Sequence, residues 1–178
     1  MIENRYILYS LAAGAIAGAF SSIIMVLTLS GAFEDLVREL MYRQLLLSGL
    51  PQEKIPEIVA RVVESLKSFY WLMPIGPVIN MLLFGALLGL LLDFLVKKLK
   101  KPYIASILTG VVFMVLFQLA PLLSLKAIYG SWFTELLDRY MGMHLIIAPS
   151  VLYTVLLTIF SSVRGPWARW GEAEPEKY

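Results

Sequence analysis

The chain has 178 residues, of which 59% are hydrophobic and only 16% are charged. Soluble domains carry about 25% charged residues, so this composition excludes an ordinary water-soluble protein. The absence of cysteine excludes disulfides, thiolate nucleophiles and Cys-bound metals, and a formal net charge of +2 is too small to indicate a nucleic-acid-binding protein. The low content of two Asn and three Gln fits a thermophilic source, as it fits any very apolar chain.

The charged residues are clustered and leave four long uncharged runs, at residues 6–33, 68–92, 102–125 and 140–163. A helix needs about 20 apolar residues to cross the hydrocarbon core of a bilayer. Each run exceeds that length, so the sequence predicts four transmembrane helices, at residues 7–29, 72–96, 103–125 and 143–163. The first is longer than the core of a signal peptide and is interpreted as a retained span. We therefore predict an all-α integral membrane four-helix bundle, with residues 1–166 as a single membrane domain.

The long loop after the first span has the pattern of a helical hairpin, at residues 33–69. Apolar residues recur at helical spacing in residues 33–47, Gly49 and Pro51 end that helix, and a second apolar stripe follows Pro56. A shorter amphipathic segment occupies residues 130–141. We expect these helices to cap the extracytoplasmic face of the bundle, either as interfacial anchors or as a lid or partner-docking surface.

The loop between the second and third spans indicates the orientation. It is short and strongly positive, with lysines at positions 97, 98, 100 and 101. Positively charged loops remain in the cytoplasm. Four spans then place both termini in the cytoplasm, including a polar tail at residues 167–178, and the expected location is the cell membrane.

The two halves of the chain show a weak internal similarity. Four positions in the first loop have counterparts one hundred residues later: Phe33, Asp35, Leu36 and Met41 correspond to Phe133, Glu135, Leu136 and Met141. The sequence Ile75-Gly76-Pro77 at the start of the second span also resembles Ile147-Ala148-Pro149 at the start of the fourth. This pattern is typical of a parallel repeat, as in some transporters, but so few apolar matches also arise by chance.

Small and hydroxyl residues four positions apart lie on one face of a helix. Three predicted spans carry such ridges: Ser10, Gly14, Gly18 and Ser22 in the first, Gly85 and Gly89 in the second, and Ser150, Thr154 and Thr158 in the fourth. Because lipid provides no hydrophobic drive for helix association, close backbone approach and interhelical hydrogen bonds must provide it. The ridges predict either internal packing of the first two spans or homo-oligomerisation.

Four polar residues in the spans are candidates for a binding site or a polar path: Asp93, Asn80, Gln118 and His144. Asp93 lies four residues before Lys97, which indicates either a locally neutralised interfacial acid or a proton or cation site facing the bundle interior. Asn80, Gln118 and His144 predict either separate interhelical hydrogen bonds or an outward-facing polar cavity. His144 has no second ligand at metal-binding spacing, so no metal site is predicted.

The sequence contains no P-loop, no HExxH and no GxSxG motif. We therefore predict no catalytic residues and no cofactor. The predicted function is a non-enzymatic interaction or scaffolding protein of the membrane, with the bilayer, further copies of itself or other membrane proteins as partners. The alternative is a small oligomeric transporter or channel for an ion or small solute, with Asn80, Gln118 and Asp93 along its path.

Overall fold

The computed structural model describes residues 4–29, 32–163, 165 and 167. Throughout this part of the chain the secondary structure is helical, with no strands, which confirms the all-α class. Four helical segments are long and apolar enough to cross a membrane: Arg5–Thr28, Tyr70–Leu99, Pro102–Tyr129 and Met143–Ser162. The prediction of four helices of membrane-spanning length is confirmed. Apart from Trp167, the predicted polar tail at residues 167–178 lies outside the described residues.

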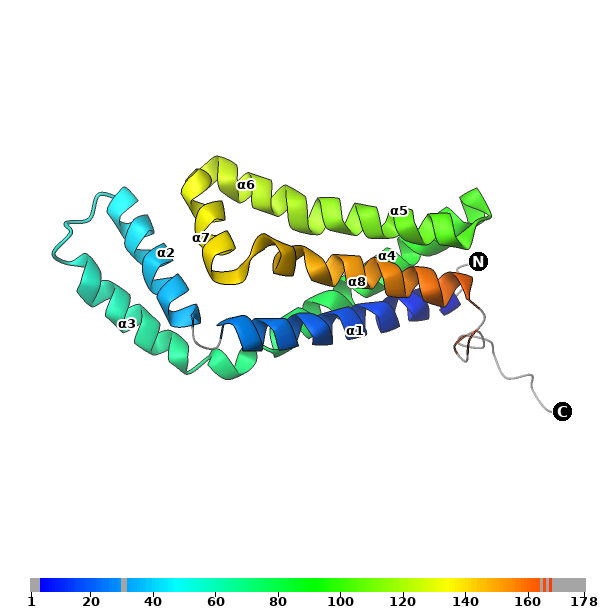
Figure 1. The fold of residues 1–178 in the computed structure, drawn as a ribbon, viewed down its shortest axis with the longest axis horizontal. Helices are drawn as coiled ribbons and strands as arrows, with labels where there is room; N and C mark the ends of the chain where they lie inside the picture. The colour runs from blue at the N-terminus through cyan, green and yellow to red at the C-terminus, as the bar shows by residue number, and fades with distance from the viewer. Residues whose placement is uncertain (1–3, 30–31, 164, 166, 168–178) are drawn as a thin grey trace.

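The four spans lie side by side along the long axis of the molecule (Figure 1). They consist of α1 (Asn4–Leu29), α4 (Ile75–Leu99), α8 (Met143–Ser162) and a composite third span. That third span contains α5 (Pro102–Met114), a π-helical turn (Val115–Leu119) and α6 (Ala120–Tyr129). The start of α1, the α4–α5 connection and the end of α8 lie at the same end of the bundle (Figure 1).

The spans associate as two tightly packed pairs. α1 packs most extensively on α4, and α5 packs on α8, while α1–α8 and α4–α5 contacts join the two pairs. The core between the two pairs contains both small and aromatic residues, and Ala13, Ala17, Phe113 and Tyr153 are almost completely buried there. Large apolar side chains such as Leu87 instead point outward, which is expected of helices that face hydrocarbon.

Three amphipathic helices lie at the other end of the bundle (Figure 1). They are α2 (Phe33–Leu47), α3 (Ile55–Lys67) and α7 (Ser131–Met141), and a short 3-10 turn at Tyr70–Leu72 connects α3 to α4. We refer to α2, α3 and α7 together as the cap. Gly130 (φ 86°) and Gly142 (φ 75°) flank α7, and their positive φ angles, which favour glycine, allow the chain to turn sharply before and after it.

Two small apolar clusters hold the cap together. Ile55, Val59 and Val63 of α3 are buried against the apolar side of α2. Leu36 of α2 and Leu136 of α7 are buried in a second cluster that also includes Met25 of α1. Leu36 and Leu136 are among the positions that the weak internal similarity relates. The second cluster attaches α2 and α7 to the bundle rather than leaving them as loose loops.

Candidate functional site

The glycine ridges of the first two spans lie against each other in the α1–α4 interface. A Cβ atom at Gly14 would collide with the Met81 carbonyl oxygen, and one at Gly85 would lie 2.8 Å from the Ser10 carbonyl oxygen. Gly18 and Gly89 are equally close to the opposite backbone, with Cβ distances of 2.9 Å to Val78 Cα and 2.7 Å to Ile7 Cα. The absence of side chains at these glycines therefore permits direct backbone contact between α1 and α4.

Ser10 connects three helices through its hydroxyl group. Its Oγ lies 2.5 Å from the Gly85 carbonyl oxygen of α4 and 2.6 Å from the Tyr153 hydroxyl of α8. Donation by Ser10 to the carbonyl leaves its oxygen free to accept from Tyr153, so both hydroxyl groups are satisfied although both residues are buried. Ser22, at the other end of the same ridge, donates to the Pro74 carbonyl oxygen at 2.5 Å.

The α5–α8 interface relies on pairs of polar side chains instead. Ser150 of α8 donates to Gln118 Oε1 at 2.6 Å, and the hydroxyl groups of Ser106 and Ser161 are 2.5 Å apart. Gln118 lies in the π-helical turn of the third span. A π turn displaces the helix face by one residue, and such turns are frequent at functional sites. In this structure it places the Gln118 amide against α8.

The hydroxyl ridge of α8 is directed partly at its own backbone. Thr154 donates to the Ser150 carbonyl oxygen at 2.7 Å, and Thr158 donates to the Thr154 carbonyl oxygen at 2.8 Å. A Cβ atom at Gly110 of α5 would collide with the Thr154 side chain. Thr154 therefore fills the space that Gly110 leaves open between the two helices.

Asp93 lies in the bundle at the end that carries the lysine-rich loop. It is 4% exposed, and Lys97 Nζ lies 2.6 Å from its Oδ2 atom. A buried carboxylate requires a partner, and Lys97 provides a charged one on the same helix face. The Lys97 side chain is 43% exposed, so its ammonium group reaches from the buried acid toward the outside. This geometry is that of a locally neutralised acid.

The four polar candidates do not lie along one continuous contact path. Asn80 is exposed on α4 and His144 is exposed at the start of α8, whereas Gln118 bonds to Ser150 within the bundle. Among the described residues, no hydrogen bond or ion pair joins any two of Asp93, Asn80, Gln118 and His144. No group of three metal-ligating side chains occurs in that part of the chain either.

Glu39 is the polar centre of the cap. Its carboxylate pairs with Arg43 at 2.8 Å and with Arg139 at 3.6 Å, and it accepts a hydrogen bond from the Tyr140 hydroxyl at 3.3 Å. The Arg43 guanidinium also lies 5.4 Å from the centre of the Trp132 ring. Burial, and secondly the bond to Glu39, raise the pKa of Tyr140. These contacts fix α2 to α7 on the outer side of their apolar cluster.

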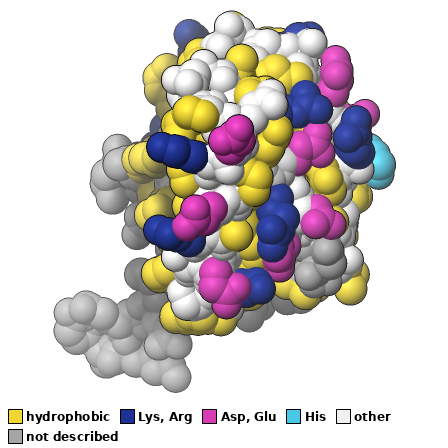
Figure 2. Space-filling view, turned by 90° about the vertical axis from the view of Figure 1, so that its left-hand side faces the viewer, with side chains coloured by type: hydrophobic (Ala, Val, Ile, Leu, Met, Phe, Trp, Pro, Cys, Tyr) yellow, Lys and Arg dark blue, Asp and Glu magenta, His cyan; other side chains and the backbone are white. Residues whose placement is uncertain are grey.

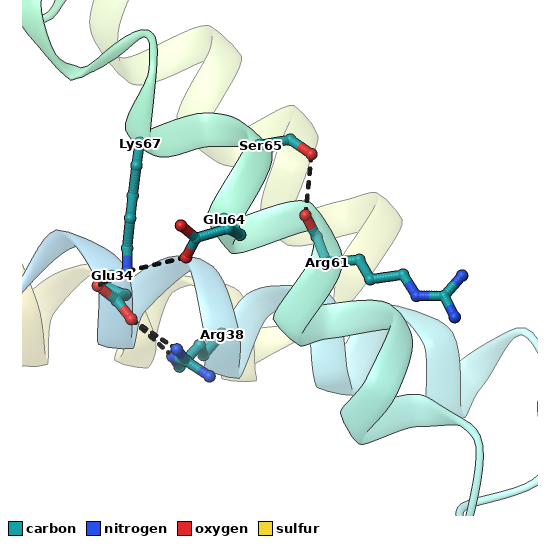
Figure 3. Close-up of polar contacts among 6 residues, drawn as sticks. All are labelled: Glu34, Arg38, Arg61, Glu64, Ser65 and Lys67. Atoms are coloured by element: carbon teal, nitrogen blue, oxygen red, sulfur yellow. Dashed lines mark hydrogen bonds and ion pairs between the residues drawn. The ribbon is translucent and has the colours of Figure 1, made fainter.

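A second charged group, which we call the clasp, joins the start of α2 to the end of α3 (Figure 3). Glu34 accepts hydrogen bonds from Arg38 at 2.5 and 3.2 Å, and Lys67 Nζ lies 3.0 Å from Glu64 and 3.8 Å from Glu34. The hydrogen bond from Arg38 holds the pKa of Glu34 below its ordinary value. The bond to Glu64 raises the pKa of Lys67. The clasp consists of Glu34, Arg38, Glu64 and Lys67.

Two cavities adjoin the cap. The cap cavity, of about 490 Å³, lies between α2 and α7 and is lined by Glu39, Tyr42, Arg43, Leu46, Leu47 and Trp132. The lateral cavity, of about 430 Å³, lies beside α1 and α4, with Met25, Phe69, Tyr70, Gly76, Pro77 and Asn80 in its lining. Basic and acidic side chains are interspersed with hydrophobic ones over the cap end of the molecule (Figure 2). Of the four polar candidates, Asn80 is in the lining of the lateral cavity.

Sequence reasoning missed Tyr153, Glu39 and Trp132 as structurally central residues. Tyr153 carried a usable signal, since the hydroxyl group of a tyrosine in an apolar span needs a partner. Glu39 and Trp132 carried none that identifies their role, because the contacts between α2 and α7 join segments about one hundred residues apart.

The fold defines an all-helical protein whose four apolar helices indicate a multi-pass membrane protein. No protein-family model matches the chain, and neither does any curated protein or solved structure.

Proposed function

We propose that the protein is a non-enzymatic interaction protein of the membrane, and that its cap binds the extramembrane part of a partner protein at the cap cavity. The observation that carries this proposal is the composition of that cavity. Its lining combines Tyr42, Arg43 and Trp132 with exposed leucines, and Leu47 is 69% exposed. Tyr, Trp and Arg are the residues that dominate binding energy at protein interfaces, usually beside apolar contacts that exclude water.

The packing of the bundle supports a role for the cap rather than for the ridges. Gly14, Gly18, Gly85 and Gly89 are occupied by the α1–α4 contact. Ser10 and Ser150 donate to groups on neighbouring helices. Because these devices for helix association are used inside one chain, they are not available to a second chain. The cap cavity, in contrast, is open to the outside and is not filled by another part of the described chain.

The cap lies at the opposite end from the lysine-rich loop, so the proposed partner is extracytoplasmic, with both termini of the chain in the cytoplasm. The positive-inside rule supports this orientation. A single cysteine replacing Leu99 tests it, because the chain has no native cysteine. A membrane-impermeant maleimide should label Leu99→Cys only after the membrane is opened. Labelling of Leu99→Cys in intact cells would contradict this orientation and would mean that the cap lies on the cytoplasmic side.

A photo-crosslinking amino acid at position 47 tests the docking site in native membranes. The matched control position is Arg61, on the outer face of α3, whose side chain is 78% exposed and does not line the cavity. We expect one defined protein adduct from position 47 that is absent from position 61 and that is lost when Tyr42→Ala is added. Equal adducts from both positions, or adducts with lipid alone, would contradict the docking site and would mean that the cap is an interfacial anchor.

Transport is the second candidate, and the burial of Asp93 is the observation that favours it. A carboxylate that is 4% exposed in an apolar span is expensive and is typical of proton or cation pathways. The Lys97 partner at 2.6 Å and the lack of contact between Asp93 and the other polar candidates favour the interaction protein instead. Ion flux in proteoliposomes separates the two functions: transport requires a measurable flux that Asp93→Asn abolishes in a folded protein.

A further inference from the structure

The proposed function uses the cap cavity and leaves the lateral cavity without a role. The lateral cavity lies where the last turns of α1 meet the first turns of α4, and its lining includes Met25, Phe69, Tyr70, Gly76 and Pro77. Its volume of about 430 Å³ falls within the range of about 300–1,000 Å³ that is typical of small-molecule sites. Most of the lining residues are apolar, and the cavity is open to the outside.

The position of the cavity along the spans determines which molecules reach it. Gly76, Pro77 and Asn80 belong to the uncharged run of residues 68–92, and Met25 belongs to the run of residues 6–33. Both runs form helices that are apolar and long enough to cross a bilayer. An open apolar cavity at this depth is adjacent to lipid chains, so hydrocarbon rather than water is the default occupant.

Two polar groups near the cavity have no hydrogen-bonding partner in the described part of the protein. Asn80 has no hydrogen-bonding partner among the described residues, and the Tyr70 hydroxyl is buried there without one. Unsatisfied polar groups are costly in hydrocarbon, where no water replaces the missing bond. The Tyr70 hydroxyl is too deeply buried to meet a ligand in the open cavity, whereas the exposed Asn80 amide is a donor that can bond to an ester, ether or phosphate oxygen.

The charges near the cavity do not select a net negative ligand. Arg38 and Lys67 lie within electrostatic reach of Tyr70. Both are already paired within the clasp, with Glu34 and Glu64. The ligand is therefore defined by an apolar chain and hydrogen-bond-accepting oxygens rather than by its net charge.

We propose that the lateral cavity binds a single membrane lipid, with one chain against Met25, Gly76 and Pro77 and its ester- or phosphate-bearing region at Asn80. This inference does not depend on the proposed function of the cap cavity, because the two cavities share no lining residue. A lipid in this position would fill the junction between the bundle and the end of α3.

Gly76 offers a position from which the cavity can be filled. Apart from its two chain neighbours, a Cβ atom at Gly76 meets no atom within 4 Å, and Gly76 lines the cavity, so a larger side chain has open space there. We therefore choose Gly76→Trp as the blocking variant. Leu87→Trp is the matched control, since Leu87 lies on the same helix, is 59% exposed and does not line the cavity.

The experiment uses the full chain in phosphatidylcholine vesicles that contain a trace of phosphatidylcholine with a photoactivatable diazirine in its acyl chain. After illumination, tandem mass spectrometry locates the adducts. We expect adducts to concentrate at Met25 and at residues 69–80 in the wild type and in Leu87→Trp, and to be lost from these positions in Gly76→Trp. Asn80→Leu should weaken the same labelling, because it removes a donor while leaving the apolar lining intact.

Two results would overturn the proposal. One is labelling spread evenly over exposed residues of α4 such as Leu83 and Leu87, with no change in Gly76→Trp or Asn80→Leu. The other is a protein–protein cross-link at Met25 or Gly76, which would show that a second chain covers the cavity. Asn80→Leu changes an exposed position and keeps the test decisive if Gly76→Trp fails to fold, and the result at the cap cavity is independent of either outcome.

Discussion

The bundle and the cap are held together by different interactions. In the bundle, α1 and α4 make backbone contact at glycines, and buried hydroxyl groups bond across helices, as Ser10 does to Gly85 and Tyr153. In the cap, small apolar clusters are surrounded by exposed ion pairs such as Arg38–Glu34. Helices of membrane-spanning length gain no hydrophobic drive from lipid, so shape and hydrogen bonds must hold them together, whereas surfaces in water allow the ordinary combination of burial and charge.

The largest effect is expected from Gly14→Ala. The added methyl group would collide with the main-chain carbonyl oxygen of Met81, and no side-chain rotation can relieve a backbone contact. Separating α1 from α4 also weakens the Ser10–Gly85 bond. We expect a loss of about 3 kcal/mol in the free energy of unfolding, at the upper end of the usual cost of overpacking. Unfolding by SDS in mixed micelles measures it.

Gly76→Ala is the control for this substitution. Gly76 is also a glycine of α4, but a Cβ atom there meets nothing within 4 Å. Its stability should change far less than that of Gly14→Ala, because the higher helix propensity of alanine is offset by the cost of a side chain directly before Pro77. If both substitutions have the same small effect, direct backbone contact does not stabilise the bundle and the contrast with the cap fails.

A smaller and reversible effect is expected from Gly110→Ala. Here the collision is with the side chain of Thr154 rather than with backbone. We expect a loss of about 1–2 kcal/mol in the free energy of unfolding. The swap Gly110→Ala with Thr154→Gly removes the obstructing atoms and should be more stable than Gly110→Ala alone.

Thr154→Gly alone completes the double-mutant cycle for this pair. A favourable coupling between the two substitutions is expected, since they share one contact. Additive losses would mean that α5 and α8 move apart to accommodate the added methyl group. In that case the fit between Gly110 and Thr154 does not stabilise the α5–α8 interface.

The contrast between bundle and cap also explains how much of the structure could be predicted from the sequence. The four spans were accessible from the sequence because the uncharged runs are long and a bilayer imposes their length. The ridges identified which face of a helix carries small residues, but periodicity does not identify the neighbour. The bond between Ser10 and Tyr153 joins residues 143 positions apart, and no local pattern encodes it. The π-helical turn around Gln118 was missed for a similar reason, since it changes the facing direction without a distinct sequence signal.

The smallest effect is expected at the clasp, and it should depend on pH. The pKa of Glu34 is lowered in the folded protein, chiefly by the hydrogen bond from Arg38. Its contribution is therefore present above its unfolded-state pKa and is lost as the pH falls through the folded-state pKa. Lys67 has a raised pKa, so its contribution is present at neutral pH and is lost only as the pH rises through that raised value.

Acidification should accordingly loosen α2 and α3 while leaving the α1–α4 interface unchanged. Hydrogen exchange at pH 7 and pH 2, corrected for the intrinsic rate, measures both regions in one experiment. The Glu34→Gln variant isolates one carboxylate from the other acids of the cap, because it should be looser than the wild type at pH 7 and equal to it at pH 2, where the carboxyl group of the wild type is protonated as well. An equal response of wild type and variant would assign the pH dependence to other groups, such as the Glu39 pairs between α2 and α7. Loosening of α1 and α4 to the same extent would show that the cap and the bundle unfold as one unit, in spite of their different interactions.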